Sequence, residues 1–144
     1  MQYHFKVHQE KAGYWAQCVE LEGCVTQAST KKQLQINMQE ALSLYISERS
    51  NSKDLAVMPN KKIKPAENIV AVSVDPEVAF SFLVRYWRLT HGWTQKQAAE
   101  KMGFEKLYSY QRLEAKKCNP SLKIINMLKK IYPEFSIDVA LAAS

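Results

Sequence analysis

The chain has 144 residues, and its 20 Lys and Arg side chains against 14 Asp and Glu give a formal net charge of +6. Hydrophobic residues make up 47% and charged residues 24%, a balance that suits one folded domain or two small ones and excludes a disordered chain. No apolar run approaches the roughly 20 residues that span a bilayer, and the N-terminus lacks a signal-peptide pattern. We therefore expect a cytoplasmic protein without a membrane anchor.

The positive charge is concentrated in the second half. Residues 1–58 carry six basic and six acidic side chains, whereas residues 76–144 carry eleven basic and six acidic ones. A neutral half followed by a basic half predicts two modules, the second of which meets a polyanion. The three cysteines, Cys18, Cys24 and Cys118, form an odd set without a C-x-x-C spacing, so we expect reduced packing residues, with no metal site and no cofactor.

The first module begins with strand-like sequence. Apolar and polar residues alternate over 3–8, which predicts a strand that turns its apolar side chains inward and His4 and His8 towards solvent. Two further short strands, 14–21 and 24–28, follow after turns. Together these segments predict a small antiparallel sheet.

A helix and a fourth strand complete this module. Thr30 opens a helix whose apolar stripe runs to about Ile46. The stretch 49–68 is polar and punctuated by prolines, which indicates a loop or linker, and the apolar run 69–74 predicts a strand that returns to the first sheet. The predicted order is β-β-β-α-β over residues 1–74.

Parts of this module follow the pattern of one family. The pair GY at 13–14, the run ELEGCVTQ at 20–27 and the helix end EALSLY at 40–45 resemble the HicB antitoxin domain, a truncated RNase H-like fold. The family usually writes the turn as P-D-L-P-G-C, and both prolines are absent from VELEGC at 19–24. The resemblance implies a partial RNase H-like domain.

An RNase H-like fold raises the hypothesis of a metal-dependent nuclease. Glu20 and Glu22 would share one strand face, as a metal-binding pair does. No aspartate precedes Asp54, however, and the first strand carries Lys6 and His8 where hydrolytic relatives place carboxylates. We therefore expect no enzymatic activity and interpret the two glutamates as an acidic edge that faces solvent or a partner.

The second module, residues 75–144, has the signals of four helices. Asp75 and Pro76 open the first, which ends at Gly92. A capping box opens the second helix, at 94–103, and a third lies within 105–115. The last of the four runs from about 121 to 133.

The short second helix, a glycine turn and the third helix are typical of a helix-turn-helix. Ala99 is small where the third helix would cross, and Gly103 suits a left-handed turn. Tyr110 and Leu113, three residues apart, would hold the third helix against the others. This pattern predicts an all-α DNA-binding domain.

The same segment resembles the XRE or Cro/C1-type helix-turn-helix family, through TQ at 94–95, RLE at 112–114 and NPSL at 119–122. The resemblance implies a structural ion pair between Arg88 and Glu114. The spacing from the glycine turn to Glu114 is one residue longer than the family usually shows, so the docking register of the third helix stays open.

An exposed face of the third helix would read base edges in the major groove, where Arg and Gln make paired contacts to guanine and adenine. The candidates on that face are Lys106, Tyr108, Ser109, Gln111 and Arg112. Side chains that flank it would hold phosphates and set the orientation. These candidates are Gln95, Lys96, Lys116 and Lys117.

The C-terminal stretch 135–141 alternates apolar residues with polar or small ones, which predicts a strand. A strand with a free edge needs a partner. A symmetric second chain would supply it, because helix-turn-helix proteins bind palindromic operators as dimers. We therefore expect a homodimer or a higher homo-oligomer.

The two resemblances together imply an α+β protein that serves as the antitoxin of a type II toxin-antitoxin system. HicB antitoxins mask a HicA-type toxin, a small mRNA interferase, and those with a DNA-binding domain repress their own operon. An acidic edge with two aromatic residues would meet the toxin, through Glu10, Tyr14, Trp15, Glu20 and Glu22. The alternative is a stand-alone helix-turn-helix transcription factor with an N-terminal sensor domain, and the third hypothesis is the nuclease.

Overall fold

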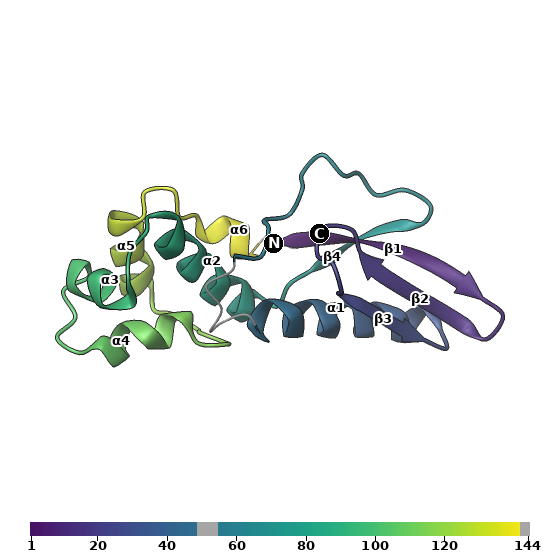
Figure 1. The fold of residues 1–144 in the computed structure, drawn as a ribbon, viewed down its shortest axis with the longest axis horizontal. Helices are drawn as coiled ribbons and strands as arrows, with labels where there is room; N and C mark the ends of the chain where they lie inside the picture. Colours follow the sequence, from purple (N-terminus) through teal and green to yellow (C-terminus); the bar gives the residue numbers. More distant parts are fainter. Residues whose placement is uncertain (49–54, 142–144) are drawn as a thin grey trace.

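The structure is a computed structural model that describes residues 1–48 and 55–141 (Figure 1). Its N-terminal half is a four-stranded antiparallel sheet in the order β3-β2-β1-β4. The strands are β1 (Gln2–Glu10), β2 (Gly13–Cys18), β3 (Val25–Ala28) and β4 (Ile69–Ser73), and α1 (Lys31–Glu48) lies between β3 and β4 in the chain. The predicted order β-β-β-α-β is confirmed.

Helix α1 covers one face of the sheet. Alternation along β1 places Tyr3 and Phe5 on that face, where neither is exposed, and Leu42 from α1 is equally buried. The register sets Phe5 opposite Cys18 on β2 and opposite Val70 on β4. The predicted inward face of β1 is therefore correct.

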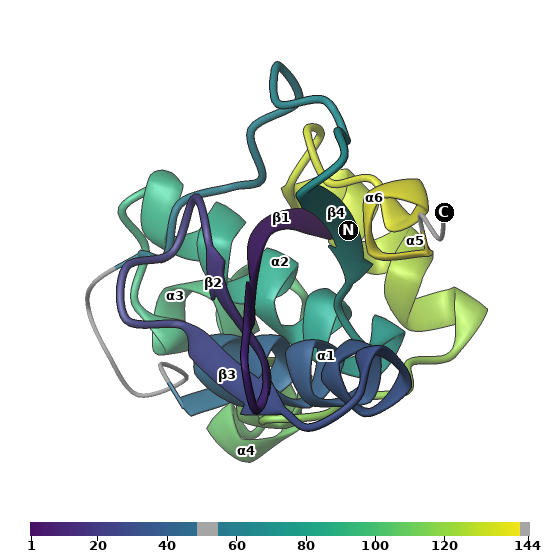
Figure 2. The same cartoon turned by 90° about the vertical axis from the view of Figure 1, so that its right-hand side faces the viewer.

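The other face of the sheet is partly covered by the loop at 55–68, which lies on the side opposite α1 in both views (Figures 1 and 2). On this side the Asn60 N–H donates to the Glu20 carboxylate at 3.1 Å, and the same carboxylate pairs with His4 Nδ1 at 2.9 Å. Under this loop His4 is only 7% exposed. The prediction that His4 faces solvent is wrong, because a loop far along the chain covers this part of the strand.

The C-terminal half consists of short helices around α2. They are α2 (Pro76–Thr90), α3 (Gln95–Lys101), α4 (Leu107–Gln111), the 3₁₀ turn η2 (Arg112–Glu114), α5 (Leu122–Ile131) and α6 (Ile137–Leu141). Residues 78–85 of α2 are all buried, because α2 packs against α1 on one side and against η2 and α6 on others. Helix α2 thus joins both halves in one core.

The predicted strand at 135–141 is wrong, because this stretch forms α6 instead. Phe135 anchors it with an edge-to-face contact to Phe80 of α2, at 5.8 Å between ring centroids. Ala140 is buried while Asp138 is exposed, which fits a helix but not a strand, where residues two apart share a face. Packing on α2 selects the helix.

The three cysteines are free, with Cys18 and Cys24 buried in the core. Among the residues described, no helix has the length and apolar character needed to cross a membrane.

Candidate nucleic-acid interface

Helices α3 and α4 pack against each other, and the sequence fixes both the start of α3 and the turn after it. Thr94 caps α3: its hydroxyl accepts from the Gln97 N–H at 3.1 Å, and the Gln97 side chain accepts from the Thr94 N–H at 2.8 Å. Ala98 and Ala99 are buried, which lets the neighbouring helices approach closely. Gly103 turns the chain with φ of +75°, a conformation that glycine adopts without strain.

Helix α4 is held by a tyrosine pair on its inner side. Tyr110 is fully buried, and its hydroxyl lies 2.8 Å from the hydroxyl of Tyr132 at the end of α5. Burial raises the pKa of both phenols, that of Tyr132 to about 12. Leu113 is also buried, so both predicted anchors of the third helix point inward.

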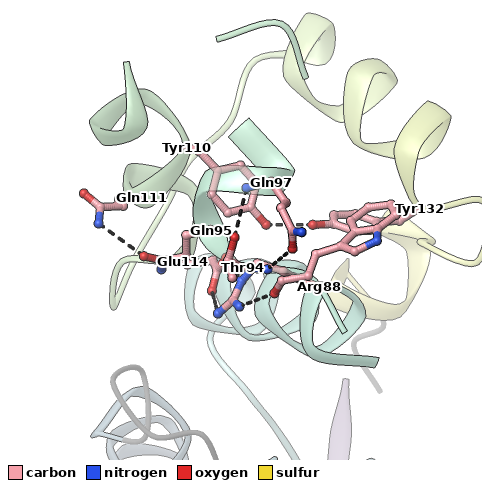
Figure 3. A network of polar contacts seen from close by, with 9 residues as sticks. Arg88, Thr94, Gln95, Gln97, Tyr110, Gln111, Glu114 and Tyr132 are labelled. Atoms are coloured by element: carbon pink, nitrogen blue, oxygen red, sulfur yellow. Dashed lines mark hydrogen bonds and ion pairs between the residues drawn. The ribbon is translucent and has the colours of Figure 1, made fainter. Parts of the chain in front are cut away.

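An ion pair fixes η2, the 3₁₀ turn that follows α4, to α2 (Figure 3). Arg88 donates to Glu114 from Nε at 2.7 Å and from Nη2 at 2.9 Å, and its Nη1 donates to the Trp93 carbonyl at 2.8 Å. The side chains are 11% and 2% exposed. Burial alone would lower the pKa of Arg88, but its hydrogen bonds to Glu114 raise it above the usual value. The predicted structural pair is confirmed.

With those anchors inside, α4 turns a polar face outward. The Gln111 side chain donates to the Gln95 side chain of α3 at 3.2 Å, so α3 and α4 present one joined surface (Figure 3). Tyr108 is 69% exposed. Of the predicted DNA contacts, Gln95 and Ser109 are half-buried, and the exposed ones are Lys96, Lys106, Tyr108, Gln111, Arg112, Lys116 and Lys117.

Two residues differ from the sequence interpretation. Lys117 lies 3.9 Å from Asp75, the N-cap of α2, so part of its charge is directed towards α2. Leu107, at the start of α4, is 42% exposed and was missed, because an apolar residue in a helix is ordinarily assigned to the core. A side chain of this kind can contact a thymine methyl group.

In the N-terminal half, the predicted partner contacts divide into two groups. Glu10, Tyr14 and Trp15 line an open hollow of about 920 Å³ that continues over β3. Trp15 stacks on His8 with ring centroids 4.0 Å apart, and Lys31 lies 6.0 Å above the Tyr14 ring. These three predicted contacts are therefore within reach of one partner.

Glu20 is not a surface residue. Its side chain is 4% exposed, and its carboxylate accepts from the His4 N–H at 2.8 Å, from the Asn60 N–H at 3.1 Å and pairs with His4 Nδ1 at 2.9 Å. The prediction that Glu20 is exposed on an acidic edge is therefore wrong, because its carboxylate binds the Asn60 N–H in the loop at 55–68. Glu22 is exposed.

In the described part of the chain, no group of three or more His, Cys, Asp and Glu side chains is placed to hold an ion. The pair Glu20 and Glu22 that the nuclease hypothesis needs is split, since one carboxylate is buried and the other exposed.

No family model matches this chain, and no curated protein is similar enough to match it.

Proposed function

We propose that this chain is a HicB-type antitoxin that binds operator DNA with its C-terminal half and a HicA-type toxin with its N-terminal half. In this proposal α3 and α4 act as a helix-turn-helix, and the N-terminal sheet with α1 acts as a partial RNase H-like domain. The chain carries out no reaction itself. It represses its own operon and masks a small mRNA-cleaving partner.

The observation that carries the DNA-binding part is the exposed face of α4. Gln111, the last residue of α4, and Arg112, the first of η2, are both exposed, while Tyr110 and the Arg88–Glu114 pair fix the backbone that holds them. Bidentate side chains on a rigid helix are the usual means of reading base edges. Lys96 and Lys106, exposed at either side of the α3–α4 turn, would contact phosphates.

Footprinting on the DNA upstream of the chain's own coding sequence tests this part. Gln111→Ala and Arg112→Ala should each lose about 1 to 3 kcal/mol of discrimination against mismatched sites. Lys123→Ala, which removes an exposed charge from α5, serves as the control and should keep the footprint. Unchanged footprints for both the Gln111 and the Arg112 variant would place the reading surface elsewhere.

The antitoxin part is supported by the hollow that Glu10, Tyr14 and Trp15 share. An aromatic residue that is half-buried at a free surface supplies contact area, while a carboxylate at its rim attracts a basic partner. An RNA-cleaving toxin must present a basic surface to its substrate. The hollow offers both aromatic contact area and a carboxylate that attracts such a basic surface.

Co-purification with the small protein encoded next to this chain tests the antitoxin part. The wild type and Gln17→Ala, a change of an exposed residue on β2, should retain the partner, whereas Trp15→Ala should release it. Retention by all three versions would exclude the hollow as the binding surface. A neighbouring protein that does not bind any of them would refute the antitoxin assignment.

A further inference from the structure

The two edges of the sheet are finished differently. β3 and β4 are the edge strands, and the backbone groups that point away from the sheet are free to pair with another strand. On β3 the outward carbonyl of Gln27 accepts from the Asn37 side chain of α1 at 2.9 Å. Asn37 in turn accepts from Gln33 at 2.8 Å, so α1 occupies one outward acceptor of this edge.

On β4 the hydrogen bonds show which groups face outward. The Val74 N–H donates to the Met1 carbonyl, and the Val7 N–H donates to the Asn68 carbonyl, so the even-numbered residues of β4 bond to β1. The backbone N–H and C=O of Ile69 point away from β1 and exchange two hydrogen bonds with Ala66. The backbone groups of Ala71 and Ser73 therefore also point away from β1. Within the described residues, these N–H and C=O groups have no partner.

The space beside this edge is open. A hollow of about 500 Å³ runs along Val70, Ala71, Val72 and Ser73, with Met38 of α1 in its wall. Ala71 and Ser73 have small side chains that do not obstruct a neighbouring backbone. The edge thus offers two donors, two acceptors and room for one strand.

We propose that β4 pairs with β4 of a second copy of this chain. In the register that the free groups dictate, Ala71 lies opposite Ser73 of the partner subunit, and a two-fold axis passes beside Val72. All four free groups on each copy are then satisfied, and two four-stranded sheets become one sheet of eight strands. The new pairing does not extend to Ile69, because the backbone groups of Ile69 are already bonded to Ala66.

A second copy fits this edge better than an unrelated strand because the pattern is complementary to itself. Antiparallel pairing about a two-fold axis brings each Ala71 to the partner's Ser73 and the reverse, which is the isologous contact of a symmetric dimer. Val72 then meets Val72 of the partner subunit on the side that α1 covers. This pairing does not depend on the proposed function, and β4 takes the place of the predicted C-terminal strand as the surface for homo-oligomers.

Sedimentation velocity of the full chain and of two proline variants tests the proposal. Ala71→Pro removes an N–H that points outward, so it keeps the β1–β4 ladder while blocking the new one. Val25→Pro makes the same change at an outward position of β3 and is the matched control. The wild type and Val25→Pro should sediment with twice the chain mass and Ala71→Pro with the chain mass. A monomeric wild type, or a dimer that survives Ala71→Pro, would overturn the proposal.

A cross-linking experiment checks the register and covers the case in which Ala71→Pro does not fold. A mixture of Ala71→Cys and Ser73→Cys chains should give a disulfide-linked heterodimer under mild oxidation, because opposed residues of paired strands lie within disulfide range. Ala71→Cys mixed with Gln9→Cys, an exposed position on β1, is the control and should not cross-link. An equal yield in both mixtures, or none in the first, would contradict the proposed pairing.

Discussion

Glu114 is the residue on which the geometry of the candidate DNA-binding surface depends most. It is 3% exposed, and both of its carboxylate oxygens accept hydrogen bonds from Arg88. Glu114→Ala leaves the arginine buried without its partner, which should cost about 3 to 5 kcal/mol of unfolding free energy. Glu105→Ala, at an exposed site before α4, should change stability by less than about 0.5 kcal/mol. Denaturant unfolding of both variants gives the comparison, and equal losses would contradict a buried pair.

The Tyr110–Tyr132 pair predicts a loss of stability at high pH. Unfolded tyrosines ionise near pH 10, whereas the pKa of folded Tyr132 is raised to about 12 and that of Tyr110 is raised as well. The unfolded state therefore loses these protons first. The contribution of the pair is complete below about pH 10 and is lost as the pH rises towards 12.

Unfolding free energy, measured between pH 9 and 12, should fall more steeply in the wild type than in the Tyr110→Phe/Tyr132→Phe double variant. The double variant removes both hydroxyls and so leaves neither without a partner. Parallel curves would show that other groups, such as lysines, account for the decline.

Residue patterns predicted the anchors of α4 but not the role of Glu20. Tyr110 and Leu113 lie three apart on a helix, a local spacing that sequence displays directly. Glu20 is buried by His4 and Asn60, which lie 16 and 40 residues away. The alternation of apolar and polar residues along a strand shows which side chains share a face of the sheet. It does not show whether a loop from a distant part of the chain covers that face.

At the scale of elements, the loop at 55–68 is tied to the sheet chiefly through the Glu20 carboxylate and the Tyr3 hydroxyl. Glu20→Ala removes the acceptor for the Asn60 N–H and should loosen the loop, whose Lys61, Lys62 and Lys64 are exposed. Limited trypsin digestion should then cut the loop faster than in the wild type. Glu22→Ala, an exposed neighbour, should digest as the wild type does, and similar rates for both variants would contradict the clamp.

The helices of the second half were predictable because each begins with a recognisable cap. Asp75, Thr94 and Ser121 accept backbone hydrogen bonds at the starts of α2, α3 and α5. The stretch 135–141 has no such signal, and over so few residues its apolar positions fit a strand as well as a helix. Its contact with α2, which sequence does not display, makes it helical.

At the scale of the whole molecule, the two halves are joined directly, and the polar stretch at 49–68 does not lie between them. The chain passes from β4 through Val74 and Asp75 directly into α2, and the Asp75 N–H donates to Ser43 of α1 at 3.2 Å. Since α1 also packs against α2, variants of the full chain test each surface better than fragments do. The central claim is that one chain binds a toxin at the Trp15 hollow and DNA at α4.

Growth of cells that express the neighbouring small protein together with versions of this full chain tests that claim most directly. The wild type and Arg112→Ala should both restore growth, because the α4 surface takes no part in masking a toxin. Trp15→Ala, shown by circular dichroism to be folded, should fail to restore it. Rescue by Trp15→Ala equal to that by the wild type, or a neighbour that does not impair growth at all, would contradict the account.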